Sequence, residues 1–117
     1  MRRELLIVAL AVLTLRAPFL NQAIQGDDVY YLAEAEHAQI EPLHPKHTQY
    51  AFLGRMVDMR GQPHPPLNAW YLALLLALLK DIAEIPFHAA YIGFSLLAVW
   101  AMWSLAVRFS PRPLWAT

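Results

Sequence analysis

The chain contains no cysteine, and its acidic and basic side chains balance to a formal net charge of zero. The absence of cysteine excludes a disulfide framework and metal sites built from thiolates. The zero net charge gives no indication of a nucleic-acid partner, because such proteins usually carry a basic surface. The sequence also lacks internal repeats and low-complexity tracts.

Apolar residues are abundant, at 58% of the 117 residues. Soluble domains contain about 45–50% apolar residues. The excess is concentrated in blocks, which is the pattern of a membrane protein. We therefore predict an all-α, polytopic membrane protein with two to three transmembrane helices. The expected spans are about 5–20, 67–85 and 87–107, and residues 21–66 form a long external loop that carries a short surface helix.

The first apolar block, 5–20, gives a helix of about 24 Å, slightly shorter than the hydrocarbon core of about 30 Å. Arg16 near its end can extend to the lipid headgroups. The alternative is a cleaved signal peptide, since a basic start precedes the apolar run. Against that alternative, no small-x-small cleavage site follows, and Arg16 and Pro18 stand where one is expected.

The segment 87–107 is the clearest predicted span, because it carries no formally charged side chain. His88 lies at one end, and Trp100 and Trp103 lie towards the other, as aromatic residues at a membrane interface do. The segment 67–85 reaches the required length only if the charged residues at its end lie at the interface; these are Lys80, Asp81 and Glu84.

The basic residues determine the orientation of the chain in the membrane only in part. Arg2 and Arg3 favour a cytoplasmic N-terminus, which places loop 21–66 on the external or periplasmic side of the inner membrane. Three crossings would then place Arg108 and Arg112 outside as well, against the positive-inside tendency. Either the second block does not fully cross, or the charge bias is weak in this chain.

Loop 21–66 is long for a segment without structure, so we expect it to carry structure or function of its own. Asp27 or Asp28 is suited to cap a helix that runs to about Ile40. One face of this helix would hold Leu32, Ala35 and Gln39, and another Glu34 and Glu41, which predicts a helix lying along the membrane surface.

Asp27 and Asp28 are the first candidates for chemistry. In a purely structural interpretation, one aspartate caps the helix and the other is a solvated acid. Their position at a predicted membrane boundary, beside tyrosines, suggests a partly desolvated setting, which suits a carboxylate that acts as a general base. The pair also leaves a divalent metal ion open as a cofactor, although two adjacent carboxylates supply few ligands.

Four of the five histidines lie in the loop, and they offer an alternative metal site. The spacing fits no strong signature. The competing interpretation is that each imidazole bonds to nearby polar groups. The residues concerned are His37, His44, His47 and His64.

Two short motifs resemble the N-terminal region of GT-C membrane glycosyltransferases, the relatives of protein O-mannosyltransferases and aminoarabinose transferases. The first is Asp27-Asp28-x-x-Tyr31, after the first apolar block, and the second is His64-Pro65-Pro66-Leu67, at the start of the second. The family has an Asp-Glu pair followed by an aromatic residue in its first external loop. A Pro-Pro-Leu entry to the next helix comes later in the chain.

The resemblance implies a glycosyltransferase of the cell envelope that acts in lipopolysaccharide or protein glycosylation. It would transfer a sugar, with inversion, from a polyprenyl-phosphate carrier to a lipid, glycan or protein acceptor. Asp27 carries over as the general base and Asp28 as the acceptor-side acid. Asp28 stands where the family has Glu, so its reach is about one methylene shorter. Tyr31 and His64 match motif positions and are expected to bind substrate.

Family members are several hundred residues long, with about a dozen spans. The resemblance therefore implies that these 117 residues are the N-terminal part of a longer enzyme and are inactive alone. A different class of function also fits the composition: a small non-catalytic membrane protein whose acidic loop binds a partner.

Overall fold

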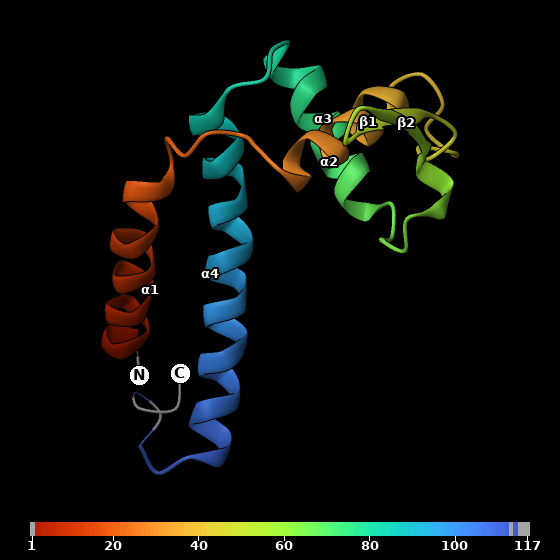
Figure 1. Ribbon diagram of the computed structural model, residues 1–117. Helices are drawn as coiled ribbons and strands as arrows, with labels where there is room; N and C mark the ends of the chain where they lie inside the picture. Colours follow the sequence, from red (N-terminus) through yellow and green to blue (C-terminus); the bar gives the residue numbers. More distant parts are fainter. Residues whose placement is uncertain (1, 113, 115–117) are drawn as a thin grey trace. The chain divides into compact units, whose positions relative to one another are not determined.

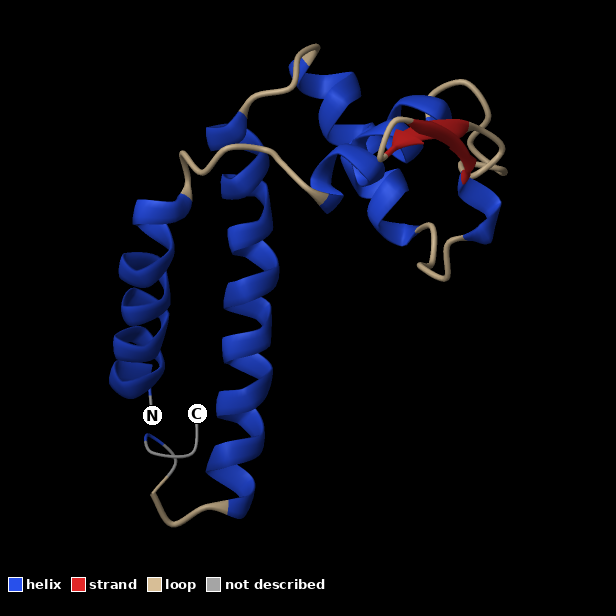
Figure 2. Ribbon diagram, viewed as in Figure 1, coloured by secondary structure: helices blue, strands red, loops and turns tan. Residues whose placement is uncertain are grey.

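The computed structural model describes residues 2–112 and 114, and most of them are helical (Figures 1 and 2). The elements in chain order are α1 (Arg2–Arg16), η1 (Ala17–Phe19), α2 (Asp27–Ala38), β1 (Gln49–Phe52), β2 (Arg55–Asp58), η2 (Met59–Gly61), α3 (Leu67–Leu79) and α4 (Glu84–Phe109). The chain forms two compact units. The terminal unit contains the residues up to Gln22 and those from Ala83 onward, and the central unit contains Ala23–Ile82.

In the terminal unit, α1 and α4 lie side by side and run in opposite directions (Figure 1). α1 gives way to the 3₁₀ helix η1, which contains Pro18, a residue with no N–H to continue an α-helix. Nδ1 of His88 lies 3.0 Å from the carbonyl oxygen of Leu20 and so joins the segment after η1 to α4. With 15 residues, α1 is about 22 Å long. The predicted span 5–20 corresponds to α1 and η1 together.

α4 contains the predicted span 87–107. Among the described residues it is the one helix long and apolar enough to cross a membrane, with 26 residues and a mean hydropathy of 1.7 over its apolar window. Only 11% of that window is buried inside the protein, whereas the core helix of a soluble protein would be mostly buried. The apolar surface of α4 therefore faces outward, which favours association with a membrane.

The central unit is built on the packing of α2 against α3 (Figure 1). Ala35 on α2 and Ala69 on α3 are both fully buried, and side chains this small allow two helix backbones to approach closely. Met59 of η2 is fully buried as well. The apolar core of this unit consists of Tyr30, Leu32, Ala35, Ala38, Met59, Ala69, Leu72 and Leu76.

The prediction of α2 as a helix along the membrane surface is wrong for two residues, whereas Leu32 and Ala35 are buried as expected. Glu34, which was expected on the outer polar face, is fully buried, and Gln39, which was expected on the apolar face, is exposed. The physical reason is that α2 packs against the rest of the central unit, where Glu34 lies beside Tyr30 and Lys46. Lys46 supplies the positive charge that a buried carboxylate requires.

The prediction of an all-α protein is also wrong, because the central unit contains a two-stranded antiparallel sheet (Figure 2). β1 and β2 pair in the register Gln49↔Asp58 to Phe52↔Arg55. Leu53 and Gly54 form the two-residue connection, with φ of 49° and 76°. Positive φ at both positions is the mark of a type I′ turn, whose twist matches that of the paired strands.

α3 is shorter than the predicted segment 67–85, because the helix ends at Leu79. Lys80 adopts the left-handed conformation, with φ of 64°, and its N–H donates to the carbonyl of Leu76 at 2.9 Å. The 13 residues of α3 extend for about 20 Å. In the described part of the chain, only the third predicted span coincides with a helix of membrane-crossing length.

Candidate functional site

The start of α2 is set by Gly26, which has φ of 60° and ψ of −123°. A residue with a β-carbon rarely adopts this conformation. Asp27 and Asp28 follow as the first two helical residues, where the partial positive charge of a helix N-terminus favours carboxylates. The structure therefore places both aspartates inside the first turn, and Gly26 occupies the cap position that was predicted for one of them.

The two aspartates differ in their contacts. Oδ2 of Asp28 accepts a hydrogen bond from the backbone N–H of Gln25 at 3.2 Å, which ties this side chain back to its own helix start. The carboxylate of Asp27 is exposed and accepts no hydrogen bond from any residue that the structure describes. Asp27 is thus open to accept a proton or a hydrogen bond from a bound molecule, while Asp28 is held.

Tyr31 and His64, the two predicted substrate-binding residues, lie against each other. Their ring centroids are 5.5 Å apart in an edge-to-face arrangement. Tyr30 packs against Tyr31 at 5.0 Å and against Tyr50 of β1 at 5.2 Å, again edge to face. Such ring pairs are favourable beyond their buried area. This aromatic cluster joins α2 to the segment that leads into α3.

Glu34 anchors the inner side of the same helix. Its Oε1 accepts a hydrogen bond from the hydroxyl of Tyr30 at 2.7 Å, and Nζ of Lys46 lies 3.7 Å from the same oxygen. Oε2 of Glu34 is buried and has no hydrogen-bond partner among the described residues. Burial and the bond to Glu34 both disfavour the tyrosinate, so the pKa of Tyr30 is raised well above its usual range.

Lys46 extends this network to the second motif. Its ammonium group donates to the backbone carbonyl of Gln62 at 2.7 Å and to that of His64. The side-chain amide of Gln62 donates in turn to the hydroxyl of Tyr50 at 2.9 Å. One lysine therefore connects the buried carboxylate of Glu34 on α2 with the backbone of the segment that carries His64.

Analysis of the sequence alone did not single out Glu34, Lys46 and Tyr30 as parts of this arrangement. A signal for Glu34 and Tyr30 was present, because residues four apart on a helix share a face. The face with Tyr30 and Glu34 also contains Ala38, which is buried. No comparable signal existed for Lys46, since its partners are brought together by the fold.

The predicted histidine cluster divides into two groups. His64 belongs to the aromatic cluster, where its ring lies 6.2 Å from that of Tyr30. His44 and His47 stack on each other, with centroids 4.6 Å apart, and both approach the carboxylate of Glu41. His37 approaches the same carboxylate from the last turn of α2. The histidines therefore gather around Glu41 without His64.

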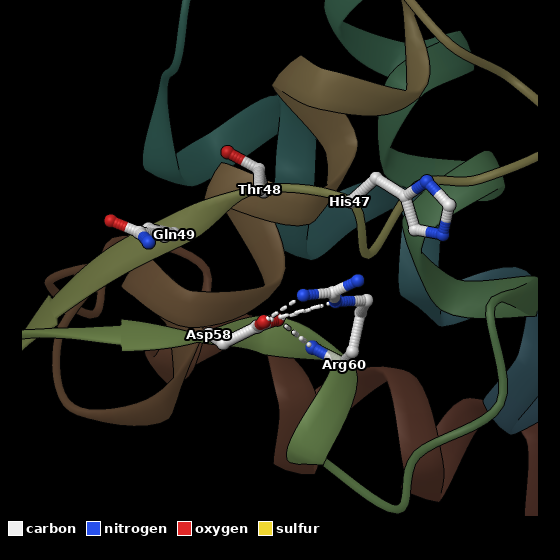
Figure 3. A pocket seen from close by; sticks show the side chains of 5 residues that line it. All are labelled: His47, Thr48, Gln49, Asp58 and Arg60. Carbon is white, nitrogen blue, oxygen red and sulfur yellow. Dashed lines mark hydrogen bonds and ion pairs between the residues drawn. The ribbon is translucent and has the colours of Figure 1, made fainter.

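A shallow hollow beside the hairpin is lined by His47, Thr48, Gln49, Asp58 and Arg60 (Figure 3). Its volume is about 240 Å³, below the ~300–1,000 Å³ usual for ligand pockets. Arg60 folds back over Asp58, and Nε of Arg60 donates to Oδ1 and Oδ2 at 3.0 and 2.9 Å (Figure 3). These hydrogen bonds from Arg60 lower the pKa of Asp58 to about 2. Because the guanidinium is already paired, this hollow offers no unpaired cation to a ligand.

Comparison of the chain with models of known protein families, with curated proteins and with solved structures finds no match in any of the three. A functional assignment therefore depends on the residues of this chain, their arrangement and the two motifs.

Proposed function

We propose that the chain is part of a membrane glycosyltransferase that transfers a sugar from a polyprenyl-phosphate carrier to a lipid, glycan or protein acceptor. The observation that carries the proposal is the edge-to-face contact of Tyr31 with His64. These residues belong to the two motifs on which the resemblance to GT-C enzymes rests. The contact brings one residue of each motif together in the central unit, which supports a shared site.

Asp27 is the proposed general base. Its carboxylate is exposed and hydrogen-bonded to no described residue, so an acceptor hydroxyl or amine can approach it. Tyr31 follows one helical turn later, which puts an aromatic ring on the same side of α2. The exposed ring of His64 adds a polar edge that can bind a sugar or a phosphate oxygen. Asp28, tied to Gln25, orients the acceptor.

In the proposed reaction the acceptor oxygen or nitrogen attacks the anomeric carbon of the carrier-bound sugar. The bond between that carbon and the phosphate oxygen breaks, and polyprenyl phosphate leaves with the electron pair. Asp27 takes the proton of the nucleophile, and the configuration at the anomeric carbon inverts. General-base assistance of this kind contributes about 10²–10⁴-fold to the rate.

The proposal includes a multi-pass arrangement in the inner membrane, with residues 21–66 on the external side. The apolar, outward-facing α4 supports the association with a membrane. An exposed apolar stripe on α3 adds to it: Leu67, Trp70, Leu74 and Leu78 lie on the face opposite the buried Leu72 and Leu76. Lipid or further helices of the same protein would cover this stripe.

The test is Asp27→Asn in the membrane protein that carries this chain, assayed for sugar transfer from a polyprenyl-phosphate donor. Asparagine keeps the shape of the side chain and removes its charge and proton affinity. We expect turnover to fall by about 10²-fold or more. Protein level and donor binding should change little, because the carboxylate of Asp27 bonds to none of the described residues.

The control is Asp28→Asn, which is expected to have the milder effect if Asp28 only positions the acceptor. An asparagine serves as well as an aspartate in a purely structural role at a helix start. Full activity of Asp27→Asn at normal protein level would therefore contradict the proposed role. Absence of transfer by the wild-type protein would favour a non-catalytic protein whose acidic loop binds a partner.

A further inference from the structure

Glu41, His44 and His47 form a cluster of metal-ligating side chains outside the site proposed above. One possible ligand atom from each residue lies within 4.8 Å of the other two. Nδ1 of His44 is 2.9 Å from Oε1 of Glu41, and Nδ1 of His47 is 3.9 Å from Oε2. The cluster therefore already holds two imidazole nitrogens around one carboxylate.

The backbone explains why these three side chains converge. The N–H of His44 donates to the carbonyl of Glu41 at 3.0 Å, and the N–H of His47 donates to that of His44 at 3.0 Å. Two consecutive four-residue turns, 41–44 and 44–47, thus place side chains 41, 44 and 47 on one side of the chain. Pro42 and Pro45 stand second in each turn, where their fixed φ is favourable.

The distances suit a small divalent transition-metal ion. In a tetrahedral zinc site, bonds of about 2.0–2.1 Å place neighbouring ligand atoms about 3.3 Å apart. The nitrogen-to-oxygen distances around Glu41, 2.9 and 3.9 Å, bracket that value. The side chains of His44 and His47 are 51% and 47% exposed, so both rings are free to turn from their stacked arrangement towards a shared ion.

His37 supplies a second observation that points to a ligand. Its Nε2 is buried, has no hydrogen-bond partner among the described residues, and lies 3.4 Å from Oε2 of Glu41. A carboxylate that binds a metal is usually oriented by such a neighbour. From its position in the last turn of α2, His37 can hold the Glu41 carboxylate towards His44 and His47.

We propose that Glu41, His44 and His47 bind one divalent transition-metal ion of the Zn²⁺ class. His37 acts as the residue that positions Glu41, and water occupies the remaining coordination position. Imidazole and carboxylate ligands suit this class of ion in a chain that has no thiolates. The same turns carry Lys46, which bonds to the backbone of Gln62 and His64. A bound ion would therefore rigidify the segment that supports the second motif.

The test uses the full chain, purified in detergent without a polyhistidine tag, stripped with a chelator and titrated with Co²⁺. Co²⁺ bound with near-tetrahedral geometry gives visible absorption bands, and added Zn²⁺ should displace it. We expect one ion per chain. His44→Ala, His47→Ala and Glu41→Gln should each weaken binding by more than ~100-fold, and His37→Ala by about 10–100-fold.

The matched controls are His64→Ala and His88→Ala, two histidines outside the cluster, which should bind Co²⁺ as the wild type does. Circular dichroism of each variant shows whether the helices are retained; the three ligand side chains are 44–51% exposed, so their removal leaves no cavity. Three outcomes would overturn the proposal: no saturable Co²⁺ binding by the wild type, retained binding in all cluster variants, or equal loss in the controls.

Discussion

At the scale of single residues, the central unit depends on a carboxylate that is out of contact with water. In the described part of the chain, Glu34 is the one charged residue that is fully buried. Its Oε1 has two partners, Tyr30 and Lys46, whereas its Oε2 has none among the described residues. Removing one partner of a buried charge is costly, because the group left behind keeps its desolvation penalty.

We expect Tyr30→Phe to lower the free energy of unfolding of the central unit by about 1–3 kcal/mol, because it removes the hydroxyl that donates to Glu34. The measurement is urea unfolding in detergent. Tyr31→Phe is the matched control, since the Tyr31 hydroxyl donates to no described residue, and it should change stability by less than ~0.5 kcal/mol. Equal losses in both variants would show that the hydrogen bond to Glu34 contributes nothing specific.

The same variant makes the pH dependence testable. The pKa of Tyr30 is raised in the folded protein, by burial first and then by Glu34. The native state therefore holds this proton more tightly than the unfolded chain. The resulting stability is complete below the unfolded pKa of about 10 and is lost as the pH rises above it. Between about pH 8 and pH 11, wild type should lose more stability than Tyr30→Phe.

At the scale of elements, the β1–β2 hairpin shows why a sequence pattern can miss a strand pair. Each strand has four residues. The connection is Leu53-Gly54, whereas the strongest hairpin signal is Asn-Gly or Asp-Gly. Leu53 adopts φ of 49°, which is unfavourable for a residue with a bulky side chain. The pairing therefore forms in spite of its turn.

This strain predicts a stabilising substitution. Leu53→Asn should raise the free energy of unfolding by up to ~1 kcal/mol, because asparagine tolerates the left-handed region better than leucine. Little packing is lost, since Leu53 is 89% exposed. Leu43→Asn is the matched control: Leu43 is 84% exposed and does not have positive φ. Urea unfolding measures both, and equal effects would show that the turn of the hairpin is unstrained.

The helices were more predictable than the hairpin. The uncharged run 87–107 predicted α4, because a continuous apolar segment of that length typically forms a helix in lipid. The prolines before Leu67 predicted the start of α3, whose first residue is Leu67. The end of α3 was predicted too late in the sequence. A helix that ends in a left-handed residue usually has glycine at that position, whereas α3 has Lys80.

The motif residues of the candidate site could be predicted from the sequence, but the buried residues beneath them could not. Asp27, Asp28, Tyr31 and His64 were chosen from two short patterns, and the fold places Tyr31 against His64. The burial of Glu34 could not be derived, since it depends on the packing of the central unit and on Lys46, a residue outside α2. Likewise, the histidines offered an alternative metal site in the sequence, but only the turns at Pro42 and Pro45 bring Glu41 beside His44 and His47.

At the scale of the whole molecule, the main question is which surfaces face lipid. α4 exposes large apolar side chains along its length, including Phe94, Leu97, Trp100 and Leu105. The central unit, in contrast, combines its apolar α3 with the acids and histidines of residues 21–66. If α4 lies in a bilayer and residues 21–66 lie outside it, these two parts of the chain differ in their access to water-soluble reagents.

The prediction is tested with single cysteines, for which the natural chain has no background. Cysteines at Gln39 and Gln49, both exposed positions, should react with a membrane-impermeant thiol reagent in intact cells. A cysteine at Leu97, which is 58% exposed on α4, should stay unlabelled even after lysis without detergent, because lipid covers it. Labelling of Leu97→Cys would show that α4 is not in the membrane. Labelling of the Gln39 and Gln49 variants only after lysis would place residues 21–66 in the cytoplasm, away from the side where the proposed transferase needs them.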